Sequence, residues 1–377
     1  MAEWKRVKLG EVCEFQRGYD LPHAKMLPGK YPVIGSSGII GWHNDYTTEA
    51  PSVSIGRSGS VGRPYLYRGK SWSHNTALYI KDFKSNDPIF VYYFLFAVRP
   101  WEYGGGSAVP TLNRNDLHGL EVSLPPLPTQ RKIAAVLGAL DDKIENNRKI
   151  CANLEAQAQA LFKSWFVDFE PFGGKMPSGW KMGKLGEIAE CNKESYTTKD
   201  EWDFVNYLDT GSITRNQIQD IQLMPMSVAP SRARRKVHEL SIVYSTVRPN
   251  QYHYGIVHNV KENMLVSTGF AVIDANNKIA SYRLFLELTQ DSVTKHFQTL
   301  AEQSVCTYPA INPSDILAHQ IVIPTLTVEQ NFYSTVSPMF EKIELANQES
   351  RARAATRDAL LSKLMSGEVD VGKVEVA

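Results

Sequence analysis

The chain has 377 residues, more than a single hydrophobic core usually organises, so two or more domains are expected. Its 43% hydrophobic and 21% charged residues are typical of a globular protein and exclude a largely disordered one. The 41 Lys and Arg residues balance 40 Asp and Glu residues, so a site for a polyanion must come from local clusters of cations rather than from net charge.

The four cysteines lie far apart, at Cys13, Cys151, Cys191 and Cys306, and form no CxxC pair. This spacing argues against a zinc site and against a disulfide framework. The chain opens on charged residues rather than an apolar secretion signal, and its longest apolar run, about residues 89–98, is too short to span a bilayer. We therefore expect a cytoplasmic protein without a membrane partner or a metal site.

An internal duplication organises the sequence. Residues 4–12 return as 180–188, and residues 109–117 return as 308–316. Between these matches, both halves contain short segments rich in Val, Ile and Tyr and broken by Gly, Pro and Asn, which predict strands and turns. The spacing of the repeat grows along the chain, which places insertions in the middle of the second half. One scaffold carrying different loops gives this pattern, although two tandem domains that merely share a fold also would.

The first half contains a glycine-rich loop with two arginines, GRSGSVGR at residues 56–63. Small residues let the backbone approach a phosphate, and arginine can reach a phosphate or a guanine edge. The GxxGxxG spacing and the lack of a following helix separate it from a dinucleotide fingerprint. A plain glycine-rich hairpin is the alternative. The candidate nucleic-acid contacts in this half are Ser36, Ser37, Arg57, Ser58, Ser60, Arg63, His74 and Asn75.

Two of these candidates have a structural alternative. Asn75 could pair with adenine through its amide, but an Asn at a strand start is also a common turn residue. His74 is expected to be a hydrogen-bonding surface residue rather than a metal ligand.

After residue 128 apolar residues recur every three or four positions, which predicts a helix of about 55 Å at about 1.5 Å per residue. Neither flanking domain could bury such a rod, so it needs a partner helix. Asn147 could fix the register by pairing across the seam, or lie half-exposed where the helices splay. Asp141 and Asp142 are expected to be solvated. The seam residues are Ile133, Leu137, Leu140, Ile144, Asn147, Cys151, Leu154, Ala158, Leu161 and Trp165.

The second half has its own candidate contacts. The loop at 245–255 takes the place of the glycine-rich loop and combines Arg, Asn, Gln and aromatic residues, which suit base edges and phosphates. Arginines just upstream could clamp a phosphate, although a charge run is usually a solvated face. Because the two loops differ, we expect an asymmetric target. The candidates are Thr210, Arg215, Arg232, Arg234, Arg235, Ser245, Arg248, Asn250, Tyr252 and His253.

The partner helix is expected at about 327–365. Its seam has apolar ends but a polar middle, which leaves room for an outside partner. Pro338 is expected to kink or split the helix near Ser337. The seam residues are Phe332, Val336, Met339, Ile343, Ala346, Ser350, Arg353, Arg357, Leu360 and Leu364.

The sequence lacks the motifs expected of a DNA-modifying or nucleotide-driven enzyme. An amino-methyltransferase needs Asn or Asp before Pro-Pro and an aromatic residue after it, whereas Pro125-Pro126 lies between leucines. No GxxxxGK[ST] loop of a nucleotide-driven motor is present. A free-standing bipartite DNA-binding protein remains an alternative, but two long helices are more than DNA reading requires.

At this point the chain resembles a known family. Residues 125–133 (PPLPTQRKI), 154–169 (LEAQAQALFKSWFVDF), 176–180 (MPSGW) and 360–369 (LLSKLMSGEV) are similar to the specificity subunits of type I restriction-modification enzymes. The resemblance covers essentially the whole chain, and the order and duplication of these motifs are more specific than any one of them.

The resemblance implies an α/β (α+β) fold with an internal pseudo-twofold repeat. Two target-recognition domains, at 1–125 and 171–324, would read the halves of a bipartite DNA target. Two spacer helices, at 126–170 and 325–377, would form an antiparallel coiled coil. The implied partners are double-stranded DNA, two methyltransferase subunits and a restriction-translocase subunit. S-adenosylmethionine would bind the methyltransferase, which modifies adenine at N6, so this chain would need no cofactor and be no enzyme.

Overall fold

The computed structural model describes residues 4–104, 111–303 and 309–373. It divides into two compact units. The first comprises Met1–Asn146 and Glu349–Ala377, and the second comprises Asn147–Gln348. Each unit therefore contains a mixed α/β domain together with one half of each long helix. Cys306 and the repeat residues Val109, Pro110 and Tyr308 lie outside the described residues.

The first unit contains three sheets. A four-stranded antiparallel sheet has the order β2-β8-β5-β6, a three-stranded sheet has the order β4-β3-β7, and β1 pairs with β9. The strands are β1 (Lys5–Lys8), β2 (Glu14–Arg17), β3 (Tyr31–Gly35), β4 (Gly38–His43), β5 (Ser52–Gly56), β6 (Pro64–Tyr67), β7 (Trp72–Ser73), β8 (Ala77–Asp82) and β9 (Glu121–Leu124). The helices are α1 (Leu9–Val12), α2 (Pro88–Val98), α3 (Arg114–His118) and the start of α4 (Leu127–Phe166).

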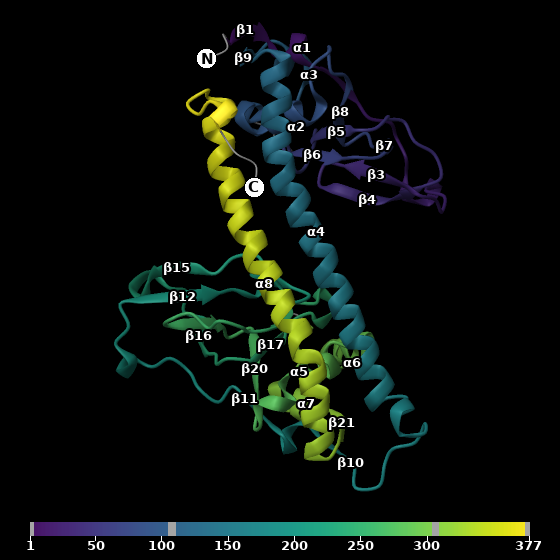
Figure 1. The fold of residues 1–377 in the computed structure, drawn as a ribbon, viewed down its shortest axis with the longest axis vertical. Helices are drawn as coiled ribbons and strands as arrows, with labels where there is room; N and C mark the ends of the chain where they lie inside the picture. The colour runs from purple at the N-terminus through teal and green to yellow at the C-terminus, as the bar shows by residue number, and fades with distance from the viewer. Residues whose placement is uncertain (1–3, 105–110, 304–308, 374–377) are drawn as a thin grey trace. The chain divides into compact units, whose positions relative to one another are not determined.

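Helix α2 shows how local sequence builds this core. The Asp87 carboxylate accepts hydrogen bonds from the amides of Ile89 and Phe90, and Pro88 at the first helical position needs no partner for an amide proton. The helix is apolar on nearly all sides because it is buried between layers. Its residues share one hydrophobic cluster with β5, β8 and the start of α4, and Figure 1 shows α2 beside β5 and β6.

The second unit has an antiparallel sheet and a two-strand pair in the same order as the first, but its other sheet has one strand more, and β13 pairs with β14 in addition. Its four-stranded antiparallel sheet is β11-β20-β17-β18, a second four-stranded sheet is β15-β12-β19-β16, and β10 pairs with β21 (Figure 1). The strands are β10 (Lys181–Lys184), β11 (Ala189–Cys191), β12 (Phe204–Leu208), β13 (Ile213–Thr214), β14 (Gln217–Ile218), β15 (Gln222–Pro225), β16 (Ala233–Lys236), β17 (Ile242–Ser245), β18 (Tyr254–Ile256), β19 (Met264–Ser267), β20 (Phe270–Ala275) and β21 (Gln320–Ile323). The helices are α5 (Ser281–Leu288), α6 (Asp291–Glu302), α7 (Pro313–Leu317) and most of α8 (Leu326–Met365).

The two long helices run antiparallel within each unit. In the first unit Asp141 of α4 pairs with Arg357 of α8 at 2.6 Å. In the second unit the Asn147 amide donates to the carbonyl of Ala346 at 3.2 Å, and the ring centroids of Trp165 and Phe332 lie 5.5 Å apart. Asn147 is only 3% exposed, so it pairs across the seam, and the half-exposed interpretation is wrong.

The predicted seam is correct at many positions of the two helices and wrong at others. Ile133, Leu137, Ile144, Cys151 and Ala158 on α4 are buried as predicted, whereas Leu140, Leu154, Leu161 and Trp165 are only half-buried. Their places are taken by residues the heptad pattern missed, Phe162 and Phe166 on α4 and Phe340 on α8. An α-helix has 3.6 residues per turn rather than 3.5, so the buried stripe moves around the helix wherever the flanking domain also covers it.

Helix α8 continues through Pro338 without a break, so the expected split near Ser337 is wrong. The polar seam residue Arg357 is already satisfied inside the first unit by Asp141, whose other oxygen accepts a 2.5 Å hydrogen bond from the Tyr93 hydroxyl. Asp141 is therefore part of a half-buried network rather than a solvated acid, while Asp142 pairs with Arg68 at the surface. Among the described helices, none is long and apolar enough to cross a membrane.

A buried polar residue in the first turn fastens each helix to the domain before it. On α4 the Gln130 side chain accepts from the amide of Asp87 and donates to the Asn86 side chain and to the carbonyl of Pro125. On α8 the Glu329 carboxylate accepts from Nε of Arg283 at 2.8 Å, and Arg283 also donates to the carbonyl of Val322.

Removing one member of the buried Arg283–Glu329 pair should be costly. Arg283 is 1% exposed, so Glu329→Ala would leave a guanidinium without its counter-charge in the core. We expect the free energy of unfolding to fall by about 3–5 kcal/mol, measured by urea denaturation. The double variant Arg283→Met/Glu329→Met removes both charges and should recover most of the loss. A Glu329→Ala protein as stable as wild type would contradict the anchoring role.

Candidate nucleic-acid interface

The glycine-rich loop of the first unit connects β5 and β6 and is held by Thr76. The carbonyl of Thr76 accepts hydrogen bonds from the amides of Arg57 and Ser58 at 2.8 and 3.3 Å. Its hydroxyl accepts from the amide of Ser36 and lies 2.9 Å from Nδ1 of His74. One residue thus brings together the three segments that the sequence singled out separately.

Two glycines of the loop are required by packing. A Cβ at Gly56 would lie 1.8 Å from the carbonyl oxygen of Ser60, and Gly62 has a φ of +77° with Trp101 directly against it. The hairpin interpretation of this loop is therefore correct for its backbone. Its polar side chains remain accessible all the same, because Ser60 and Arg63 are exposed and Arg57 and Ser58 half-exposed.

Arg57 opens onto a hollow of about 630 Å³ on the same unit. Arg17 at the end of β2 and Arg114 at the start of α3 line it as well, together with Asn113. Neither Arg17 nor Arg114 was among the nucleic-acid contacts predicted from the sequence. A signal was available for Arg114, because it replaces Pro313 within otherwise matching segments of the two halves.

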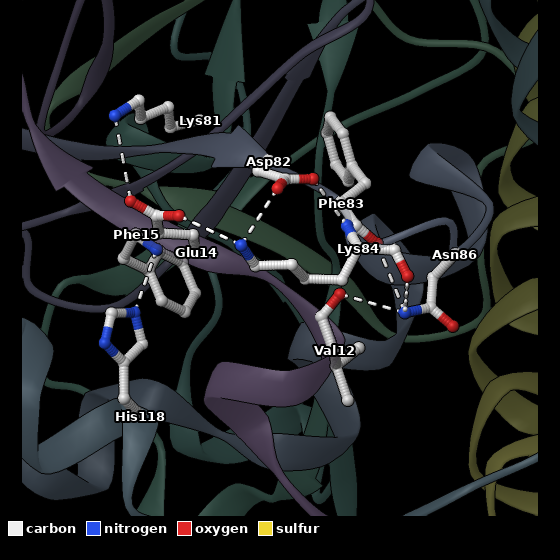
Figure 2. A network of polar contacts seen from close by, with 9 residues as sticks. All are labelled: Val12, Glu14, Phe15, Lys81, Asp82, Phe83, Lys84, Asn86 and His118. Carbon is white, nitrogen blue, oxygen red and sulfur yellow. Dashed lines mark hydrogen bonds and ion pairs between the residues drawn. The ribbon is translucent and has the colours of Figure 1, made fainter.

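His118 joins the two elements that carry Arg17 and Arg114 (Figure 2). The amide of Phe15 in β2 donates to Nε2 of His118 at 2.9 Å, and the two rings stack with centroids 5.9 Å apart. Accepting this bond requires a neutral imidazole. Burial, and next the neighbouring Arg114 guanidinium, hold the pKa of His118 below its ordinary value. The bond joins α3, which carries Arg114, to the strand that ends in Arg17.

Two lysines near the same sheet, one on β8 and one just after it, are paired with carboxylates (Figure 2). Lys84 donates to Glu14 at 3.1 Å and to Asp82 at 2.9 Å, and Lys81 lies 3.8 Å from Glu14. The hydrogen bond from Lys84 and its charge lower the pKa of Glu14. These lysines therefore differ in kind from the arginines of the hollow.

Asn75 and His74 serve the fold of the first unit. The Asn75 amide donates to the Asp20 carboxylate at 2.6 Å, which favours the turn interpretation over an adenine contact. His74 bonds the Thr76 hydroxyl, and burial lowers its pKa, with Asp20 acting in the opposite sense. Ser36 and Ser37 occupy the β3–β4 turn beside the glycine-rich loop, with Ser37 exposed.

In the second unit the corresponding loop connects β17 and β18. Its centre is a short 3-10 helix, Pro249–Gln251, flanked by Arg248 and Tyr252 in the left-handed region. The Arg215 guanidinium lies 3.8 Å from the centre of the Tyr252 ring, and the Arg215 amide donates to the Tyr252 carbonyl. Arg248 and Asn250 are exposed on the same loop.

Other candidates in this unit are held by internal contacts. The His253 ring bonds the Ile213 carbonyl at 2.7 Å, and Thr210 lies against Gly269. Ser245 does not suit a contact role, because it is 3% exposed and its hydroxyl donates to the carbonyl of Val247.

The arginine run upstream does not form one clamp. Arg232 pairs with Asp209 at 3.0 Å, while the Arg234 side chain donates to the carbonyl of Ser231. Arg235 is half-buried on β16, and its Nε is enclosed without a hydrogen-bond partner. A β-bulge between Ala233 and Arg235 separates the side chains further. The three cations therefore occupy three environments.

Comparisons with known proteins agree on one family. Residues 1–156 match the family model described as the type I restriction modification DNA specificity domain. The chain is 29% identical over 300 residues to the type I restriction enzyme MjaIX specificity subunit of Methanocaldococcus jannaschii, covering 74% of this chain and 68% of that protein. It is 21% identical over 407 residues to the EcoDI specificity subunit of Escherichia coli, covering 97% and 89%.

The fold has a solved counterpart too. The crystal structure of a type-I restriction-modification system S subunit from M. genitalium matches with a TM-score of 0.60 at 17% identity, and the match covers 96% of each chain.

The His118 bond predicts a pH dependence of stability. The unfolded chain regains a pKa near 6.5, so between the lowered folded pKa and about 6.5 the unfolded state binds more protons. His118 thus contributes stability that is complete above about pH 6.5 and is lost as the pH falls toward the folded pKa. His118→Gln keeps an acceptor for the Phe15 amide but does not titrate.

Urea denaturation at about pH 8 and about pH 5 should therefore show a smaller stability loss for His118→Gln than for wild type. His74 titrates in both proteins, so its contribution cancels in the comparison. Equal losses in the two proteins would show that His118 is not the titrating group.

Proposed function

Because this chain belongs to the type I restriction-modification specificity subunits, we propose that its two units read the two halves of a bipartite, asymmetric DNA target. Recognition of DNA targets is the role of this family, and the finer assignment concerns which parts of the chain do it. The observation that carries it is that a loop joins equivalent sheet strands in each unit but holds different residues. The loop of the first unit, Gly56–Arg63, contains glycine, serine and arginine, whereas the loop of the second unit presents Arg248, Asn250 and Tyr252. The two half-sites are therefore expected to have different base sequences.

The remainder of the chain would serve assembly. Residues 1–125 and 171–324 would be the recognition domains, related by an internal pseudo-twofold repeat. Residues 126–170 and 325–377 would be spacer helices forming an antiparallel coiled coil. The helices would dock two methyltransferase subunits and, through them, restriction-translocase subunits. S-adenosylmethionine would bind the methyltransferase, and this chain would act without catalysis.

The helix contacts support the coiled-coil proposal. Asn147 with Ala346 in one unit and Asp141 with Arg357 in the other fix an antiparallel register by polar bonds rather than by apolar packing alone. Arg357 is already paired, so an outside partner would bind the exposed faces of the helices instead of completing the seam. Leu345 on α8 is 65% exposed and is available for such a contact.

The first experiment is co-expression with a methyltransferase encoded beside this gene, followed by size-exclusion chromatography and sequencing-based mapping of methylated adenine. A stable complex that marks a split, non-palindromic motif supports the proposal. A palindromic motif would refute the asymmetry. A lone chain that binds DNA but directs no methylation would favour a free-standing DNA-binding protein.

The loop assignment has its own test in the same cells. Arg57→Ala should relax the methylated motif in one half, and Arg248→Ala should relax the other, each by about 1–3 kcal/mol of base discrimination. Both complexes should still assemble. Lys193→Ala is the control, since this exposed lysine pairs with Glu190 at 3.2 Å. A variant that lost assembly instead of specificity would place its arginine in the scaffold.

A further inference from the structure

The arginine-lined hollow of the first unit is built on backbone that is tightly fixed. Arg17 is the last residue of β2 and pairs with Leu78 of β8. The carbonyl of Arg57 accepts the amide of Leu112 at 2.9 Å, which ties the glycine-rich loop to the segment leading into α3. Arg114 opens α3, and Leu117 in the same helix is fully buried. The three Cα positions are therefore set by the fold, while the side chains of Arg17 and Arg114 are exposed.

The charge in this hollow is uncompensated. None of its eight lining residues is acidic, and three are arginines. Within the described ranges 4–104, 111–303 and 309–373, Arg17, Arg57 and Arg114 form no ion pair, unlike Lys81 and Lys84 near the same sheet. Like charges on one hollow repel each other, and an anion seated between them removes that cost. Guanidinium groups also match the oxygens of a phosphate in geometry.

We propose that this hollow binds a backbone phosphate of the first half-site, with Arg17 and Arg114 as phosphate contacts. The inference rests on the proposed function, since it assigns residues to the DNA interface of the first recognition domain. Phosphate bound here would set the register of the duplex, and the neighbouring glycine-rich loop would then meet the base edges. Arg17 and Arg114 would thus contribute affinity without sequence preference.

The described part of the second unit does not repeat the arginines at two of these positions. The amide of Ile311 donates to the carbonyl of Thr246 as that of Leu112 does to Arg57, so Thr246 takes the place of Arg57. Pro313 opens α7 in the place where Arg114 opens α3. The phosphate contact is therefore a property of one half-site.

The test measures binding of the full-length complex to a fluorescent random-sequence DNA duplex over a range of salt concentrations. Phosphate contacts act on any sequence, so the target need not be known. Arg17→Ala/Arg114→Ala should weaken binding roughly tenfold at about 0.1 M salt and reduce the slope of log Kd against log salt by about 0.9. Arg17→Lys/Arg114→Lys retains the charges and should retain most of the slope.

The matched control is Lys81→Ala, which removes a cation of the same sheet that Glu14 already neutralises. Its salt slope should equal that of wild type. Thermal melting of each variant checks that the exposed substitutions leave the fold intact. A second arm repeats the titration with inorganic phosphate as competitor.

The outcomes separate the two proposals. Wild-type complex that does not bind DNA would overturn the proposed function and this inference together. Wild-type binding with an unchanged slope in the double alanine variant would overturn the phosphate site alone. Competition by millimolar phosphate without any change of the DNA slope would mean that the hollow binds small anions rather than DNA, and would overturn it too.

Discussion

A helix of 40 residues can hold a fixed direction relative to the domain before it only if its first turn is attached firmly to that domain. In each of the two long helices of this chain, one buried polar side chain provides that attachment. Gln130 holds α4 to the chain that precedes α2, and Glu329 holds α8 to Arg283 of α5. The two residues lie at corresponding places in their helices yet use different chemistry. An amide satisfies three backbone and side-chain groups in one case, and an ion pair replaces it in the other. Because an unsatisfied polar group at either place would be costly, each helix has one way to leave its domain.

Backbone hydrogen bonds also fix the loop between β5 and β6 and the loop between β17 and β18. The amide and carbonyl of Arg57 are both hydrogen-bonded, and so are those of Thr246, whose hydroxyl also donates to the carbonyl of Gly269 at 3.0 Å. The side chain at position 57 can change without altering the path of the loop. The glycines at 56 and 62 and the Thr76 hydroxyl fix the path instead. In the first unit the path of the loop and its accessible side chains thus rest on different atoms, which would allow one scaffold to present different loops.

Sequence patterns were informative where one physical rule dominates. Apolar periodicity located both long helices, because a rod of that length must bury a stripe. It failed at Phe162, Phe166 and Phe340, where the helix packs against strands as well as its partner and the stripe shifts. It also failed at Asp141 and Arg357, because a charge looks solvated until its partner, about 200 residues away in the chain, is known. Pro338 misled since its missing amide costs one hydrogen bond, whereas packing on both sides holds the rest of the helix.

Sequence similarity between the two halves of the chain does not identify the residue of the second half that corresponds to Arg57. Aligning residues 53–57 with residues 244–248 by sequence similarity pairs Arg57 with Arg248, but the hydrogen bonds equate Arg57 with Thr246, two residues earlier. A shift of two preserves the alternation of a strand, so both alignments look equally good in a pattern of buried and exposed residues. Only the partners of the backbone amides distinguish them. Once they do, the two arginines no longer share a place: Arg57 faces a hollow with two further arginines, while Arg248 lies on a loop whose neighbouring cation, Arg215, stacks on Tyr252. The second domain thus couples its cation to an aromatic face, whereas the first leaves its cations free for an anion. If both bind DNA as proposed, the two domains would differ in how they contact the duplex and not just in which bases they read.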